Sequence, residues 1–188
     1  LAVLYALDGV GALDEADLVS ALGDSHPQVR RHALRLSESR LDKSVALRKR
    51  ALSLAVDPDP AVRFQTALSL GECHDSAATL TLAQILLNNS DSRDICDAVL
   101  TSIVDRPGRV IALLLADDQW ANSPAGESII RALVGQIARQ RRTEDLDELD
   151  LGVRPCPRDE VGEDVHPLGR VRVRDRDAQP WLVARLRG

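Results

Sequence analysis

Few side chains in this sequence are spaced for metal or redox chemistry. The three cysteines contain no Cys-x-x-Cys pair; they are Cys73, Cys96 and Cys156. The four histidines are not spaced as metal-binding pairs; they are His26, His32, His74 and His166. His74 and Asp75 could offer two metal ligands, although a histidine at a helix end beside an acidic turn is the commoner arrangement. We therefore expect neither a metal nor a cofactor.

Clustered carboxylates are the remaining candidates for chemistry, as acid–base pairs. Glu15 with Asp17, and the run Glu144–Glu148, both fall where a helix is expected to begin, and acids in a first turn stabilise a helix through its dipole. The sequence contains no glycine-rich phosphate loop, no Gly-x-Ser-x-Gly and no His-Glu-x-x-His motif. We expect this segment not to be an enzyme.

The elements that carry these residues are organised by a duplicated stretch. Residues 24–30 return 33 positions later as residues 57–63, with aspartate, proline, valine and arginine in matching places. Proline suits the first turn of a helix, and an aspartate before it can accept free backbone N–H groups. The aspartate of one copy could also bond the arginine of a neighbouring repeat, as a ladder along a stack. The alternative is an ordinary solvated turn.

A repeat of this period indicates a solenoid, and the pattern between the copies is helical. The expected helices are 1–9, 14–22, 28–37, 45–56, 60–71, 76–87, 95–104, 110–116, 125–139 and 143–151. Only 2% of the 188 residues are aromatic while 44% are hydrophobic, which suits closely packed short helices. We predict an all-α fold, a right-handed α–α superhelix, over residues 1–151. Because the chain opens on Leu1, we expect it to be a fragment cut inside a repeat.

The duplicated pattern weakens after its second copy. Ile95 keeps the valine position, but Cys96 replaces the arginine, so any ladder should stop there. From Gly152 onward, proline and arginine become frequent and helical periodicity ends. We expect residues 152–188 to be an irregular, low-order tail, in which Arg170–Arg174 alternates like a strand without a partner. The tail could be a basic arm, a linker to another domain or a frame-shifted terminus, and the last two are favoured.

Residues 1–151 resemble HEAT repeats, which are paired antiparallel helices of the armadillo type. Residues 57–63 with 67–71, and the weaker copy from Asp24, carry this resemblance. It implies a non-catalytic scaffold that binds a protein partner or other domains of a longer parent chain.

A narrower resemblance rests on residues 4–9, 29–36 and 62–72. These stretches are similar to the HEAT segment of large bacterial membrane-bound dehydrogenases that also contain a c-type haem domain. The resemblance implies that the parent is an oxidoreductase of the cell envelope or periplasm; otherwise we expect a cytoplasmic protein. None of the haem-binding or dehydrogenase residues lies in this sequence.

Charge and hydropathy argue against two further classes of partner. Residues 1–151 carry 16 basic and 23 acidic side chains, and phosphate contacts need clustered Lys and Arg. The one basic cluster is Arg48–Arg50 with Arg30, Arg31 and Arg35, which we interpret as a solvated face. No stretch approaches the roughly 18 apolar residues of a membrane span. We expect no nucleic acid, so a HEAT-like nucleic-acid-binding protein is the weakest alternative, and no membrane span.

The repeat register also predicts a binding surface. If Val29, Ala33 and Leu36 face inward, Arg31 and Arg35 point away from the core. The same two positions are occupied 33 and 66 residues on by Phe64 and Leu68, then by Asp97 and Thr101. The predicted partner-binding ridge is therefore basic, then apolar, then polar and acidic. The alternative is that a neighbouring helix covers Phe64 and Leu68.

Overall fold

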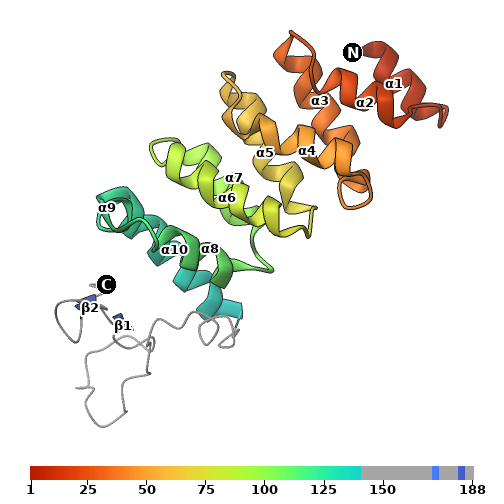
Figure 1. The fold of residues 1–188 in the computed structure, drawn as a ribbon. Helices are drawn as coiled ribbons and strands as arrows, with labels where there is room; N and C mark the ends of the chain where they lie inside the picture. Colours follow the sequence, from red (N-terminus) through yellow and green to blue (C-terminus); the bar gives the residue numbers. More distant parts are fainter. Residues whose placement is uncertain (141–170, 174–181, 185–188) are drawn as a thin grey trace.

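The fold is an α-solenoid in which antiparallel helix pairs stack one after another (Figure 1). The computed structural model describes residues 1–140, 171–173 and 182–184. One layer contains α2 (Glu15–Ala21), α4 (Val45–Ser53), α6 (Ser76–Asn88) and α8 (Pro107–Leu114). The other layer contains α1 (Ala2–Gly9), α3 (Pro27–Ser37), α5 (Pro60–Gly71), α7 (Arg93–Ser102) and α10 (Pro124–Gln140). The all-α solenoid predicted from the sequence is confirmed.

Short elements join the helices. Two 3₁₀ turns, Glu38–Arg40 and Leu54–Val56, extend α3 and α4. The segment around Trp120, expected to be a loop, contains the short helix α9 (Asp118–Ala121). The expected helix 143–151 lies outside the described residues.

Two side chains in succession accept backbone N–H groups where each helix of the duplicated stretch begins. Asp24 Oδ1 accepts the N–H of His26 (2.8 Å), and Asp57 Oδ1 accepts that of Asp59 (2.9 Å). His26 and Asp59, rather than the first aspartates, then cap α3 and α5. Asp24 and Asp57 thus accept backbone N–H groups ahead of the first turn, as expected, but the capping residues stand two positions later.

The helical periodicity of 45–56 and 60–71 predicts a core between α4 and α5, and this core is buried. Its residues are at most 6% exposed; they are Leu47, Ala51, Leu54, Val62, Thr66, Ala67 and Leu70. Thr66 is the one polar member, and its hydroxyl donates to the Val62 carbonyl at 2.9 Å. The buried face between α4 and α5 therefore leaves the Thr66 hydroxyl satisfied.

Two details of the inward faces differ from the prediction. On α3 the buried residues are Ala33, Leu34 and Ser37, while Val29 and Leu36 are only partly buried. The buried face of α3 is therefore turned slightly toward Leu34 and Ser37. On α6, the helical periodicity predicts that Leu80 faces inward with Ala83, Leu86 and Leu87, but Leu80 is 48% exposed.

A bidentate ion pair joins the first two copies of the duplicated stretch. Arg30 donates from Nε to Asp57 Oδ2 and from Nη2 to Asp57 Oδ1, both at 2.7 Å. In the next repeat, Arg63 Nε donates to Asn89 Oδ1 at 2.9 Å. The ladder is confirmed between copies one and two. It continues one step further than expected, with an amide in place of the carboxylate.

Two short strands are described in the C-terminal tail. β1 (Val171–Val173) pairs antiparallel with β2 (Leu182–Ala184), with Arg172 opposite Val183. The expectation that this alternating segment has no partner strand is wrong. Its partner is not evident in the sequence because Leu182–Ala184 has no polar–apolar alternation.

Candidate functional site

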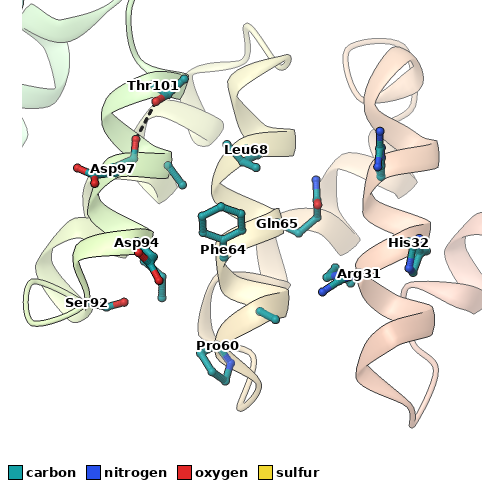
Figure 2. A pocket seen from close by; sticks show the side chains of 14 residues that line it. Arg31, His32, Pro60, Phe64, Gln65, Leu68, Ser92, Asp94, Asp97 and Thr101 are labelled. Atoms are coloured by element: carbon teal, nitrogen blue, oxygen red, sulfur yellow. Dashed lines mark hydrogen bonds between the residues drawn. The ribbon is translucent and has the colours of Figure 1, made fainter.

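A groove of about 680 Å³ crosses α3, α5 and α7 on the face of the second layer. Figure 2 shows Phe64 and Leu68 on α5, between Arg31 on one side and Asp97 on the other. The residues that line the groove come from three consecutive repeats; they are Arg31, His32, Arg35, Pro60, Ala61, Phe64, Gln65, Leu68, Ser92, Asp94, Ile95, Asp97, Ala98 and Thr101.

All six residues predicted to form the binding ridge line this groove. They lie in the predicted order, with Arg31 and Arg35 on α3, Phe64 and Leu68 on α5, and Asp97 and Thr101 on α7. Phe64 and Leu68 are half-buried and pack against the core, so no neighbouring helix covers them fully. Arg35, Asp97 and Thr101 are exposed. What the groove binds stays a prediction.

Five of the eight other lining residues could have been found by extending the same register. His32, Gln65 and Ala98 occupy equivalent positions, as do Ala61 and Asp94, each 33 residues apart. His32, Gln65 and Ala98 each follow a predicted ridge residue by one position. Ala61 and Asp94 each precede a ridge residue by three positions. Residues at i, i+3, i+4 and i+7 share a helix face, so the groove is one such face repeated three times.

His32 sits at the basic edge of the groove and is held by α1. Its Nδ1 and the Tyr5 hydroxyl share a hydrogen bond of 2.7 Å, and the two rings meet edge to face. Partial burial lowers the pKa of His32, and the charges of Arg31 and Arg35 lower it further. The positive charge of this edge at neutral pH therefore comes from the two arginines.

The opposite edge carries carboxylates on α7. Asp97 Oδ2 lies 3.6 Å from Arg93 Nε one turn earlier, with both side chains exposed. Such exposed pairs contribute little, typically about 0.2–1 kcal/mol. Asp94 is exposed and lies at the start of α7. The carboxylates of this edge thus remain accessible to an incoming cation.

A second hollow of about 520 Å³ continues the groove toward the C-terminal ends of the same helices. It shares Arg35, Gln65, Leu68 and Thr101 with the first. Its further carboxylates are Glu38, Glu72 and Asp105. Glu38 Oε1 already accepts hydrogen bonds from Ser69 Oγ (2.8 Å) and Gln65 Nε2 (3.2 Å). Glu72 and Asp105 are the exposed ones.

The residues considered for metal or redox chemistry are either bonded to another side chain of the fold or buried in it. His74 does not join Asp75 but bonds Asp42, with 2.9 Å between Nδ1 and Oδ2. Cys73 and Cys96 are buried, and burial raises the pKa of both thiols. Within residues 1–140 and the two strands, no cluster of three or more His, Cys, Asp or Glu side chains is arranged to hold a metal ion.

Comparisons with known proteins agree with the fold. Stacked antiparallel helix pairs define the class of helical-repeat proteins. Residues 15–101, from the start of α2 to the last turn of α7, match the family model of HEAT repeats, which supports a HEAT-repeat protein. Neither the curated proteins nor the solved structures contain a match. The narrower resemblance to haem-containing dehydrogenases gains no support and stays a prediction.

Proposed function

We propose that this protein is a non-catalytic interaction scaffold that docks a protein segment in the groove across α3, α5 and α7. The observation that carries the proposal is the pair Phe64 and Leu68, which forms an apolar strip only half covered by its own fold. Aromatic and aliphatic side chains at the centre of a hollow, with polar groups around them, are typical of binding hot spots. HEAT repeats commonly serve as protein-interaction scaffolds.

The charges of the groove favour protein over nucleic acid. A phosphate backbone lying across the groove would meet Asp94 and Asp97 at one edge. The basic cluster that might otherwise attract phosphates is partly engaged. Arg30 is committed to Asp57, and Arg48 Nε lies 3.3 Å from Asp75 Oδ2. Of the helices that the structure describes, none combines the length and apolarity needed to cross a membrane.

The test compares groove variants of the full chain as bait for protein partners. We expect the double change Phe64→Ser and Leu68→Ser to abolish capture of a partner that the wild-type chain binds. Because both side chains also touch the core, Thr101→Arg serves as a second variant that fills the groove from an exposed position. The matched control is Leu80→Ser, which removes an exposed apolar side chain from the other layer.

The location of the contact is read by cross-linking. A photoreactive side chain at Gln65 should cross-link the captured partner, whereas one at Leu80 should not. Thermal melting is measured for every variant. Retained capture by a folded Thr101→Arg variant, or cross-links from Leu80 alone, would contradict a groove site.

A further inference from the structure

The groove has an electric polarity across its width, and this polarity restricts what can fill it. Arg31 and Arg35 lie on α3, and Asp94 and Asp97 lie on α7. Between them α5 contributes uncharged side chains, chiefly Phe64, Gln65 and Leu68. Positive charge, apolar surface and negative charge therefore follow one another in a fixed order (Figure 2).

From this order we infer that the docked segment is itself bipolar. Its acidic end lies over α3, an apolar anchor contacts Phe64 and Leu68, and its basic end lies over α7. The inference rests on the proposed docking function and adds the chemistry of the partner. A uniformly acidic segment would meet the Asp94 and Asp97 carboxylates, and a uniformly basic one would meet Arg31 and Arg35. Charge complementarity of this kind gives specificity more than affinity.

The neighbouring groups strengthen the acidic edge and offset part of the basic one. Glu72 and Asp105 extend the negative side into the adjoining hollow. Glu38, on the α3 side, accepts hydrogen bonds from Ser69 and Gln65 but keeps its negative charge, so it offsets part of the charge of Arg31 and Arg35. Arg93 partly offsets the charge of Asp97. The lowered pKa of His32 keeps its imidazole neutral at neutral pH, so His32 adds no charge to the basic edge.

The width of the groove sets the length of the segment. Packed helices lie about 8–10 Å apart, so α3 and α7 are separated by roughly 20 Å. A helix rises about 1.5 Å per residue, so about 13 helical residues would cross the groove. An amphipathic helix that places one apolar face in a groove is a common mode of peptide recognition.

Three synthetic peptides test the inference on the full chain. All share a helical sequence of about 14 residues with two central leucines. One carries glutamates near one end and arginines near the other, the second carries glutamates at both ends, and the third carries arginines at both ends. Binding is measured by NMR titration up to millimolar peptide at low salt, where exposed charges are least screened. We expect the bipolar peptide to bind about tenfold more tightly than either uniform peptide.

Charge reversals should then exchange the preferences. Arg31→Glu with Arg35→Glu makes both edges acidic, so this variant should prefer the arginine peptide. Asp94→Arg with Asp97→Arg makes both edges basic, so it should prefer the glutamate peptide. Because arginine in the first turn of α7 opposes the helix dipole, Asp94→Asn with Asp97→Asn is the milder second variant. That variant should lose most of the discrimination against the glutamate peptide.

The outcomes separate this inference from the proposed function. Equal binding of all three peptides, abolished by Phe64→Ser with Leu68→Ser, overturns the bipolar segment and leaves the docking groove intact. Binding that is insensitive to that double change overturns the groove itself. Absence of bipolar-peptide binding at millimolar concentration, or preferences that do not follow the charge reversals, also overturns the inference.

Discussion

At the scale of single residues, two arginines hold the repeats in register. Besides its pair with Asp57, Arg30 donates from Nη1 to the carbonyls of Asp24 and Ser25. Arg63 makes the same contacts with the carbonyls of Asp57 and Pro58. Each guanidinium thus closes the turn of its own repeat and reaches the turn of the next. Cys96 occupies the arginine position in the third copy. It makes only a weak hydrogen bond there, from Sγ to the Asn89 carbonyl at 3.4 Å.

Removal of the Asp57 carboxylate should destabilise the solenoid strongly. The Arg30 and Asp57 side chains are 11% and 4% exposed, so Asp57→Ala leaves a nearly buried charge without its partner. Losses of about 3–5 kcal/mol are usual in such cases. Asp57→Asn is the matched control, because the chain already uses an amide at Asn89 for Arg63. Urea unfolding should show a smaller loss for Asn than for Ala, and equal losses would contradict the role assigned to the pair.

His32 should make stability depend on pH in mildly acidic solution. Its pKa in the folded state lies below the ordinary value of 6.5, so the unfolded chain takes up the proton first as pH falls. The free energy of unfolding should therefore decline as pH drops through 6.5, and level off below the folded pKa. His32→Gln should remove this part of the decline. In an NMR titration, Arg35→Gln should move the pKa of His32 upward, and no upward movement would show that Arg35 does not act on the imidazole.

At the scale of elements, the central helix α5 determines how closely the repeats approach. It packs against α3 on one side and α7 on the other. Its last residue, Gly71, faces Ser102 at the end of α7, where an added Cβ would lie 2.8 Å from the serine Cβ and 3.1 Å from its Cα. The sequence marks Gly71 as a helix end. It does not reveal this close approach, because the contact depends on the angle between two helices.

Gly71→Ala should push α5 and α7 apart. Overpacking of this kind costs about 1–3 kcal/mol, which exceeds the gain in helix propensity from glycine to alanine. Gly9→Ala is the control, since Gly9 ends α1 and an added Cβ there meets nothing within 4 Å. Thermal unfolding should show a lower melting temperature for Gly71→Ala only. An unchanged value would mean that the repeats adjust without cost.

The repeat spacing in the sequence predicts the groove residues but not every contact between the helices. A spacing of 33 residues was sufficient to place the six ridge residues on one groove, because equivalent positions of stacked repeats must share a face. The turn of the buried face of α3 toward Leu34 and Ser37 was not predicted from the periodicity of that helix alone. The part played by Asn89 was missed for a different reason. It stands one residue before the position equivalent to Asp57, so the strict register passes over it.

At the scale of the whole molecule, the solenoid is built from interactions between neighbouring repeats. Each repeat contacts mainly the one before and the one after, so stability is nearly a sum of local terms. The last described helix, α10, still belongs to this stack. Its Ile129, Leu133 and Ile137 are at most 7% exposed, and Gln136 Nε2 donates to the Leu100 carbonyl at 3.4 Å. Removal of α10 should therefore expose the end of the core.

The boundary proposed near Gly152 can be tested by two truncations of the chain. Ending it after Gly152 removes the segment rich in proline and arginine together with β1 and β2, and isolated two-stranded ribbons are marginally stable at best. We expect the melting temperature of the solenoid to stay unchanged. Ending the chain after Ser123 instead removes α10 and should lower it by several degrees, because three buried apolar side chains are lost. A comparable drop for the longer truncated chain would show that residues 153–188 pack on the repeats and that the domain extends beyond residue 151.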